Sequence, residues 1–486
     1  MVAPPSARGP VRLRVQRRIS LQAPLGAYAD ALSGASGPCL LLDTATGTSG
    51  RSLLALETGS EIRAYRGAFA GRRHTVRTEI QRAFGAPDVS ATDPLDAIAH
   101  ELALVRETHG DSTDTSYACG YLAYEAAGFF HKLPTLGPHS AGEPADVAFA
   151  VVTTFLVEER GGTAYISALG TGDTEALAHE DALQRLDQQE ARLQNVALAD
   201  AGSPHRGAPS AAAKLPLPTA DRPNYEASVQ RCIEHITAGD VFELCLTREL
   251  RVPYTGVPGR LYAAMRGANP AARGAYLALA GLTILCTSPE LLLRSTAEGT
   301  LETGPIKGTR PRAAHPAKDA ALREELANSA KDRAENVMIV DLARHELGQV
   351  AKVGSVCVPS LFRVESHALV HHLVSTVRAQ LRPDQTVYDA IRAVFPAGSM
   401  TGAPKVQAIK TLSALENRSR GVYAGALGYI SADGSCELAV VIRTVTLQDG
   451  TARLGTGGAV TADSVPQAEY DETCVKAAGL WALLGA

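Results

Sequence analysis

Hydrophobic residues change their spacing along this chain, which predicts strands in its first part and a mixture of helices and strands afterwards. Between about residues 11 and 160, short apolar runs bounded by turn-forming residues are typical of strands. The clearest runs are 11–19, 38–43, 51–57 and 146–159. A Thr- and Gly-rich stretch at 44–50 separates two of these runs and predicts a hairpin.

Helical spacing of leucines begins at 174 and predicts a helix over 174–194. The next stretch, 197–223, has few large apolar residues and many Pro, Ala and Gly, so it predicts a linker. This divides the chain into an N-terminal region, 1–196, and a second domain, 224–486. Further elements expected in that domain are a helix at 224–239, a strand at 241–250, a strand pair at 283–294 and 300–309, one helix over 317–347, and two helices around a Gly/Pro turn within 384–415.

Charged residues interrupt the apolar face expected for the last helix. An apolar run ends at Arg443, a Gly-rich turn follows at 455–464, and a helix is expected from 465 onward. Glu469, Glu472 and Lys476 fall within about a sixth of the helical circumference, on the stripe that Leu480 and Leu483 continue. Either this first turn is solvated, or a metal or ionic ligand compensates buried charges.

A second helix repeats this pattern, because Glu335 stands within the apolar stripe of Met338, Ile339 and Leu342. Carboxylates from two helices, without a Cys/His cluster, suit a hard cation such as Mg²⁺ completed by substrate oxygens and water. The alternative is a salt-bridge network that includes Lys476 and Arg443.

Several other polar residues stand at turns and strand ends where they could take part in chemistry. Lys307 lies between a Pro-constrained strand end and a Gly turn, and Glu290 closes a strand as a candidate acid. The Gly-rich turn at 395–405 enters a helix and could cradle an anion. The paired histidines at 371–372 are either structural or a base. The sequence has no P-loop, GxSxG elbow, dinucleotide fingerprint or glutaminase Cys–His signature.

Composition limits the class of protein and its partners. The chain has 486 residues, of which 45% are hydrophobic and 20% charged, as in ordinary globular enzymes. A net charge of −4 gives no reason to expect nucleic acid, and no apolar run is long enough to span a membrane. Eight scattered cysteines without a CxxC pair favour a reducing compartment. The Arg-rich N-terminus partly resembles a transit peptide, but it alternates as a strand does, so we expect a cytoplasmic protein.

Eight sequence blocks follow one another along the second part of the chain. They are TSPE (287–290), ETGPIKGTRPR (302–312), AENVMIVDLARHELG (334–348), VHHLVSTV (370–377), FPAGSMTGAPKVQAI (395–409), GVYAGALGYI (421–430), VIRT (441–444) and GTGGAVTADSVPQAEYDET (455–473). In this order they resemble the chorismate-utilising enzyme family, which includes anthranilate synthase component I, aminodeoxychorismate synthase component I, and isochorismate and salicylate synthases. The resemblance covers 224–484, and the more variable first region also resembles the family at 120–125 and 146–152. Lys307, in the block PIKGT, resembles aminodeoxychorismate synthase, where anthranilate synthases carry Ala.

This resemblance implies an α/β (α+β type) fold of two antiparallel β-sheets packed face to face, with helices outside. It implies a Mg²⁺ site at Glu335 and Glu472, with Glu469 beside them. It also implies a general acid at Glu290, a nucleophile at Lys307 that attacks C2, and His372 near the substrate ring. The substrate would be bound by Arg443, Tyr423, Gly457, Gly458, Lys476 and Thr401. Lys307 must be neutral to act as a nucleophile, and we expect burial near the metal to lower its pKa.

The activity implied is Mg²⁺-dependent amination of chorismate at C4, toward p-aminobenzoate and folate or a related antibiotic precursor. Ammonia would come from a separate glutamine amidotransferase subunit in a heterodimer. The alternatives are C2 amination with pyruvate release, as in anthranilate synthase component I, isochorismate or salicylate synthesis, and a non-catalytic regulatory subunit that binds chorismate. A tryptophan pocket in the N-terminal region matches only loosely.

The sequence departs from the usual family pattern at a few positions. His345 and Glu346 replace a common Asn-Asp pair, Gly304 replaces Arg, and Arg273 replaces an aromatic residue. The stretch ELCLT at 243–247 replaces Gln-x-Asn. None of these changes removes an expected catalytic group.

Overall fold

The computed structural model describes residues 10–22, 25–33, 39–43, 51–69, 72–82, 86–106, 116–131, 133, 142–159, 162–195 and 216–485. The two short 3₁₀ helices are Tyr124–Ala126 and Gly398–Met400. The α-helices are α1 (Leu25–Ser33), α2 (Pro94–Leu104), α3 (Ala127–Phe130), α4 (Glu175–Gln194), α5 (Arg222–Thr237), α6 (Pro258–Ala268), α7 (Pro316–Asn328), α8 (Ala330–Gly348), α9 (Val387–Val394), α10 (Lys405–Glu416) and α11 (Pro466–Leu484).

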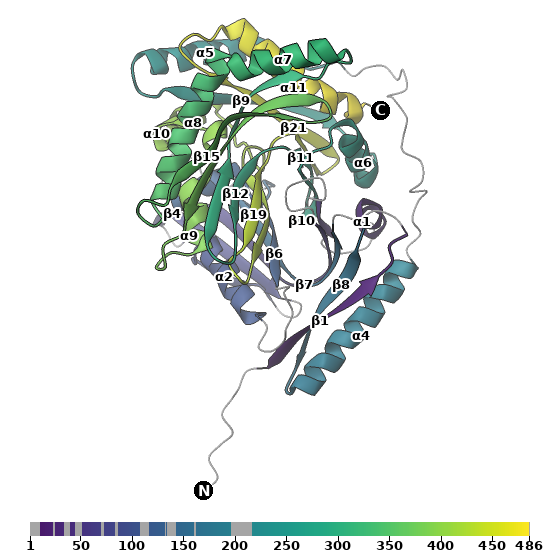
Figure 1. The fold of residues 1–486 in the computed structure, drawn as a ribbon. Helices are drawn as coiled ribbons and strands as arrows, with labels where there is room; N and C mark the ends of the chain where they lie inside the picture. Colours follow the sequence, from purple (N-terminus) through teal and green to yellow (C-terminus); the bar gives the residue numbers. More distant parts are fainter. Residues whose placement is uncertain are drawn as a thin grey trace.

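The strands form two antiparallel sheets that share one pair of long strands (Figure 1). The first sheet runs in the order β17 (Gly402–Ala403), β9 (Glu243–Pro253), β21 (Thr451–Val460), β20 (Thr444–Gln448), β11 (Leu282–Ser288), β10 (Arg273–Leu279), β2 (Cys39–Asp43), β3 (Arg51–Phe69), β7 (Val147–Glu159), β8 (Ala164–Gly172) and β1 (Val11–Ile19). The second runs in the order β5 (Asp88–Ser90), β4 (Arg72–Arg82), β3, β7, β6 (Tyr117–Leu122), β18 (Ala426–Ser431), β19 (Cys436–Val440), β12 (Leu291–Ser295), β13 (Thr300–Gly304) and β16 (Val370–Gln380), which also pairs with β14 (Ile306–Pro311) and β15 (Cys357–Ser366).

The shared strands β3 and β7 pass from one sheet to the other because their pairing is irregular in the middle. The register shifts several times between Ala55 and Glu61. Bulges of this kind bend a strand and increase its twist. On one side of the shifts β3 pairs with β2, and on the other side it pairs with β4.

Side chains that alternate along β7 separate the core into layers. Ala148, Ala150 and Val152 belong to the cluster between the two sheets, which also contains Leu277 and Leu427. The residues that alternate with them on β7 face the other way, into the cluster under the helices. A period of two along a strand places both sets in apolar surroundings, as a sheet covered on both faces requires.

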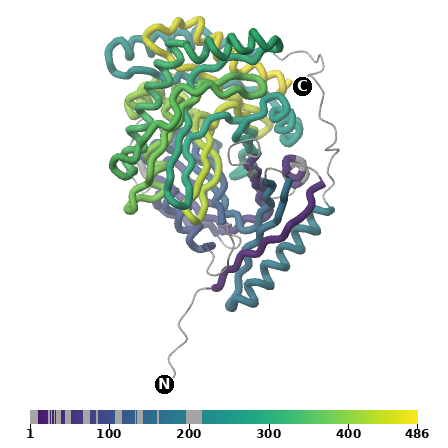
Figure 2. The backbone as a smooth tube through the Cα atoms, in the orientation of Figure 1, coloured from purple at the N-terminus to yellow at the C-terminus, as the bar shows by residue number. Residues whose placement is uncertain are grey.

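Helices cover the outer face of each sheet, so the expected fold is confirmed (Figure 1). Helices α2, α8, α9 and α10 contribute to the cluster on the second sheet. Helices α1, α4, α6 and α11 contribute to the cluster on the first sheet, and Figure 2 shows α4 running beside β1. Strands of the two predicted regions pair directly, β2 with β10 and β6 with β18, while the domain boundary itself stays a prediction.

Most elements expected from the sequence are present. The strand at 11–19, the hairpin of β2 and β3, the strand β7 and the helices α4 and α5 are confirmed. The turn of the hairpin, at 44–50, lies outside the described residues, as does 197–215 of the expected linker. The last linker residues are described and are packed, because Trp481 donates a hydrogen bond from Nε1 to the Pro216 carbonyl (3.3 Å).

Three local expectations are wrong. The helix over 317–347 is two helices, because Ser329 caps α8 by accepting a hydrogen bond from the Asp332 amide. The strand pair at 283–294 and 300–309 is interrupted in both strands, so that only β12 and β13 pair there. In α11 the expected stripe is buried at Glu469 and Leu480, but Glu472 is exposed. The rest of the buried face runs through Tyr470, Thr473 and Ala477.

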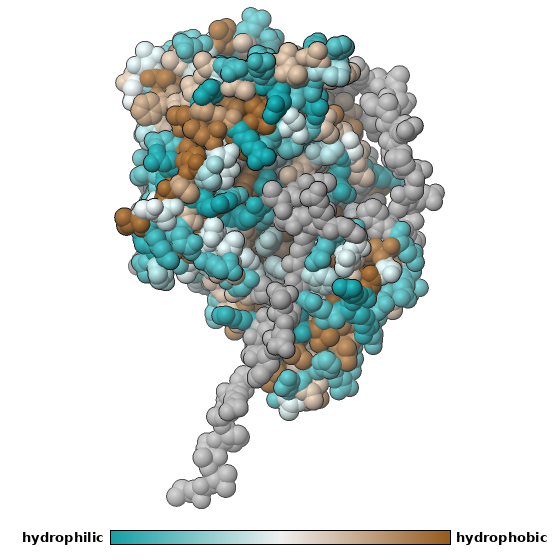
Figure 3. Space-filling view, in the orientation of Figure 1, coloured by the Kyte–Doolittle hydropathy of each residue, from teal (hydrophilic) through white to brown (hydrophobic). Residues whose placement is uncertain are grey.

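Two further observations concern the surface and the cysteines. Within the described ranges, no helix is long and apolar enough to cross a membrane. Apolar and polar residues are interspersed on the face drawn in Figure 3. All eight cysteines are free thiols.

Candidate active site

A cavity of about 700 Å³ opens where β9, β14, β16 and β21 meet the N-terminal parts of α8 and α11. All but two of the residues proposed from the sequence line it, and the exceptions are Thr401 and Glu469. The residues that do line it are Glu290, Lys307, Glu335, His372, Tyr423, Arg443, Gly457, Gly458, Glu472 and Lys476.

Glycines on β21 form one wall because no side chain fits there. A Cβ on Gly457 would lie 2.6 Å from the Leu246 carbonyl oxygen, and one on Gly458 would lie 3.0 Å from Glu469 Oε2. A Cβ on Gly455 would lie 2.1 Å from the ring of Tyr423. Bare backbone therefore faces the cavity, and Tyr423 packs directly on it.

Arg443 and Lys476 place positive charge beside this wall. Lys476 Nζ donates to the Gly457 carbonyl (3.0 Å) and lies 2.7 Å from Glu472 Oε1. Arg443 has a φ of 51°, in the left-handed region. Its carbonyl accepts hydrogen bonds from both the amide (3.1 Å) and the hydroxyl (3.0 Å) of Thr287, which hold this strained backbone in place.

Glu335, Glu469 and Glu472 approach the cavity from α8 and α11. Glu469 is 4% exposed, and its Oε1 accepts a hydrogen bond from Ser464 (2.7 Å), whereas its buried Oε2 has no hydrogen-bond partner. Burial raises the pKa of Glu335 to about 7, although Lys307 opposes that shift. Buried carboxylates of this kind favour a nearby cation.

The same carboxylates do not form a complete metal cage by themselves. Among the described residues, no three His, Cys, Asp or Glu side chains converge closely enough to hold a metal ion. The donor set nevertheless suits Mg²⁺, which keeps several waters and is bound through one or two carboxylates together with substrate oxygens. The orphaned Glu469 Oε2 beneath Gly458 fits such a site.

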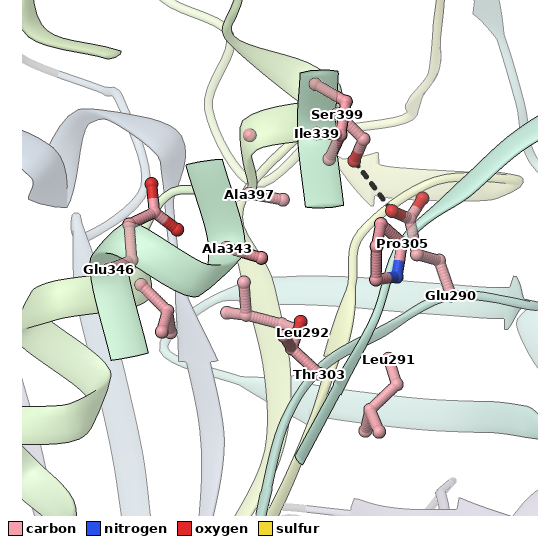
Figure 4. Close-up of a pocket in the computed structure, with 12 residues that line it drawn as sticks. Glu290, Leu291, Leu292, Thr303, Pro305, Ile339, Ala343, Glu346, Ala397 and Ser399 are labelled. Carbon is pink, nitrogen blue, oxygen red and sulfur yellow. Dashed lines mark hydrogen bonds between the residues drawn. The ribbon is translucent and has the colours of Figure 1, made fainter. Parts of the chain in front are cut away.

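Glu290 and Ser399 form a hydrogen-bonded pair at the cavity wall (Figure 4). Ser399 Oγ donates to Glu290 Oε1 over 2.7 Å. Burial raises the pKa of Glu290 to about 7, and the Ser399 hydrogen bond and Lys307 limit that rise. A carboxyl group that titrates near neutral pH can remain protonated and act as an acid.

Behind Glu290 lies a small cavity of about 20 Å³, which is room for one water molecule. Glu346 lies at the other end of this cavity in Figure 4. Its Oε1 is 2.6 Å from Lys405 Nζ, which also donates to the Val394 carbonyl. Burial raises the pKa of Glu346 to about 7 and lowers the pKa of Lys405. Lys405, in the turn expected to cradle an anion, is therefore engaged with a carboxylate of the chain itself.

Lys307 forms a buried ion pair with Glu243, which was not singled out from the sequence as a site residue. Lys307 Nζ donates to Glu243 Oε1, and Glu243 is 0% exposed. Burial by itself lowers the pKa of Lys307, but the charges of Glu243 and Glu335 outweigh it, and the pKa is raised. This direction is opposite to the one expected from burial, because the neighbouring carboxylates favour the charged amine.

The two neighbouring histidines point to opposite faces of β16, as successive strand residues do. His371 is structural, with its ring nitrogens 2.8 Å from Ser366 Oγ and 3.1 Å from Asp319 Oδ1. His372 lines the cavity, and its buried Nδ1 has no hydrogen-bond partner. Burial, helped by the positive charge of Arg443 and by His367, lowers the pKa of His372 to about 3, so the ring is neutral.

The structure places some expected residues away from the cavity and adds others to it. Thr401 is fully buried, and its hydroxyl donates to the carbonyls of Ala397 (3.1 Å) and Gly398 (3.3 Å). Ser399 lies two residues earlier, in a block that the sequence had already marked. Glu243 belongs to the stretch 243–247, where the sequence departs from the usual family pattern. That departure was the only feature of the sequence that pointed to Glu243.

The other departures lie outside the cavity surface. Arg273 pairs with Glu437 (3.2 Å) and donates to the Pro289 carbonyl (3.0 Å). Gly304 is buried next to Leu291, and a Cβ on Gly304 would lie 3.5 Å from the Leu291 Cβ. His345 is exposed.

Known proteins are similar to this chain in sequence or in fold over most of its length. The chain is 43% identical over 349 residues to the aminodeoxychorismate synthase of Streptomyces griseus, and this match covers 71% of this chain and 47% of that protein. It is 37% identical over 394 residues to anthranilate synthase component 1 of Streptomyces coelicolor, and this match covers 79% of this chain and 76% of that protein. The crystal structure of anthranilate synthase component I from Streptococcus pneumoniae gives a TM-score of 0.72 at 27% identity and covers 89% of this chain and 92% of that chain.

The match to the aminodeoxychorismate synthase extends over less than half of that protein's length. The sequence profile of the chorismate binding enzymes, by contrast, matches residues 38–482, which is nearly the whole chain. The chain therefore belongs to the chorismate binding enzyme family.

Proposed function

We propose that the chain aminates chorismate at C4 and produces 4-amino-4-deoxychorismate. The observation that carries this proposal is the position of Lys307, buried in the wall of the same cavity as Glu290. Substitution at C4 by way of a covalent adduct at C2 requires both a nucleophile and an acid. Lys307 provides the nucleophile and Glu290 the acid. The identity to aminodeoxychorismate synthases supports the same product.

Arg443, Lys476 and the backbone of Gly457 and Gly458 would hold the two carboxylates of chorismate. A dianion is matched by a site with a guanidinium, an ammonium and bare backbone along one wall. Tyr423, packed on Gly455, would support the substrate on the same side.

Glu335 and Glu472, with Glu469 beneath them, would hold Mg²⁺. When bound, the ion supplies positive charge for a substrate carboxylate and fixes the position of the ring. The chain's own groups supply the acid and the nucleophile.

The reaction begins with proton transfers within the cavity wall. Glu243 accepts a proton from Lys307 Nζ, and the free amine forms a bond to C2 while the ring double bonds shift. The C4–O bond breaks, and Glu290 protonates the departing hydroxyl, which leaves as water. Ammonia then adds at C4 and gives a proton to Glu290, while Lys307 leaves C2 and recovers its proton from Glu243.

Ammonia would come from a separate glutamine amidotransferase, as one subunit of a heterodimer. At neutral pH ammonia is mostly ammonium, which is not nucleophilic, so delivery to a shielded site is favoured over diffusion. The free thiols are consistent with a cytoplasmic location, which we include in the proposal.

The second candidate is anthranilate formation, because anthranilate synthase component 1 matches a larger share of the chain. Incubation of the pure protein with chorismate, Mg²⁺ and ammonium, followed by identification of the product by mass and retention time, separates the two. Anthranilate as the main product would refute C4 amination, and no product would leave only a chorismate-binding role.

The same assay tests the partner. We expect ammonium salts to support turnover increasingly as pH rises, and glutamine to support it only when an amidotransferase subunit is added. Glutamine-dependent turnover by the pure chain would contradict this expectation.

A further inference from the structure

A second chamber of about 170 Å³ adjoins the large cavity on the far side of His372. The two cavities share the residues of their common wall, which are Pro289, Val370, His372, Arg443 and Leu480. The other walls come from the loop after α6 and from α11, so the chamber lies between elements that are far apart in the sequence.

The chamber differs from the main cavity in its chemistry. Its lining is mainly apolar, with Pro270, Leu369 and Leu480 among its residues. Its polar lining residues are Arg443 and His372, at the boundary with the main cavity, together with Asn269 and His367. His372 offers a neutral ring with an unpartnered, buried Nδ1. Such a space favours an apolar group over water.

Small residues keep the chamber open. Ala271 and Ala272 line one side and Gly479 lines the other. The next residue, Arg273, cannot fill the space, because its side chain is engaged with Glu437 and the Pro289 carbonyl. A Cβ on Gly479 would meet nothing within 4 Å, so this position has room for a larger side chain.

The volume sets the size of the group that fits. An apolar cavity of roughly 150 Å³ takes a benzene molecule. A phenyl ring therefore matches the 170 Å³ chamber.

We infer that this chamber is a second subsite, which takes an apolar group the size of a phenyl ring attached to a carboxylate held by Arg443. The inference rests on the proposed function in one respect, which is the assignment of Arg443 to a substrate carboxylate. Its ligands are small aryl carboxylates with a short linker between the ring and the carboxylate. Such compounds would compete with chorismate for Arg443 and gain affinity from the chamber.

Calorimetric binding of 3-phenylpropanoate and propanoate to the full chain tests this subsite without any turnover. Both probes carry the same carboxylate, so their difference isolates the ring. We expect 3-phenylpropanoate to bind at least about tenfold more tightly, from the apolar area buried. We also expect chorismate to displace it. Equal affinities, or binding that chorismate does not displace, would overturn the inference.

Two variants fill the chamber from opposite sides, Gly479→Leu and Ala272→Leu. Each should remove the preference for 3-phenylpropanoate and leave the affinity for propanoate unchanged. Gly348→Leu is the matched control, because this helical glycine also has nothing within 4 Å of its Cβ and does not line the chamber. Leucine also has a higher helix propensity than glycine, so the two glycine variants should fold. A preference retained in both filled variants would overturn the inference.

The outcomes distinguish this inference from the proposed function. If the wild-type chain binds the aryl probe as expected but forms no 4-amino-4-deoxychorismate, the subsite stands and the proposed reaction is wrong. If it forms that product but does not prefer the aryl probe, the reaction stands and the subsite is wrong.

Discussion

Replacing Glu290, the proposed acid, with Gln should stabilise the fold at alkaline pH while it removes activity. Glu290 is 4% exposed, and its pKa is about 7 in the folded chain against an ordinary value of 4.5. The folded state therefore holds its proton more tightly than the unfolded state does. Stability is lost as pH rises through the window from 4.5 to about 7, because the unfolded state ionises first.

The magnitude follows from the size of that shift. One pKa unit corresponds to about 1.4 kcal/mol, so ionisation of Glu290 costs the folded state about 3 kcal/mol above pH 7. Gln has the same shape, can accept the Ser399 hydrogen bond and does not ionise. The stabilisation by Glu290→Gln should therefore rise from about 1 kcal/mol near pH 5 to about 3 kcal/mol near pH 8.

Urea-induced unfolding of wild type and variant at both pH values measures this change. The stabilisation should change by about 2 kcal/mol between the two pH values. Taking this difference removes any effect of the substitution that does not depend on pH. The exposed Glu324, changed to Gln in the same way, is the matched control and should show almost no such difference. Turnover should fall by roughly 10²- to 10⁴-fold, as expected for loss of a general acid. A stability difference that stays constant with pH, or decreases toward pH 8, would refute the reasoning.

Three further predictions concern neighbouring groups. Ser399→Ala removes a hydrogen bond to the ionised form of Glu290 and should raise the pKa of Glu290. The ratio of variant to wild-type turnover, measured at equal pH, should therefore increase on the alkaline side, and a constant ratio would contradict this. Lys307→Ala should lose most formation of 4-amino-4-deoxychorismate and form some anthranilate, as measured by product chromatography; an unchanged rate and product would reduce Lys307 to a structural residue. Glu335→Gln and Glu472→Gln should each abolish turnover and leave the circular dichroism spectrum intact, and near wild-type activity with an unchanged Mg²⁺ requirement would refute the metal assignment.

The sequence by itself determined most elements and most of the lining of the cavity. Strand alternation in β7 and the leucine spacing of α4 follow from period alone, because each face of an element must meet apolar surroundings. Glu290, Lys307 and Arg443 each stand in a block that resembles the family, so the sequence identified them without knowledge of the fold.

Helix rotation and breaks were decided by packing. The spacing in α11 showed which residues share a face, but tertiary contacts rotated that face so that Tyr470 and Thr473 are buried and Glu472 lies at the edge. The break at Ser329 depends on a local cap that competes with continuation of the helix, and the periodicity on both sides conceals it.

Only the tertiary structure decided the partners that set the chemistry of the site. Glu243 and Lys307 form a hydrogen bond although they are 64 positions apart in the sequence, and Ser399 and Glu290 do so although they are 109 positions apart. The charge of a buried group depends on burial and on its neighbours within a few ångströms, and neither is encoded in spacing along the chain. For this reason the sequence identified Lys307 as a candidate nucleophile, but the direction of its pKa shift came from a carboxylate that the fold brings against it.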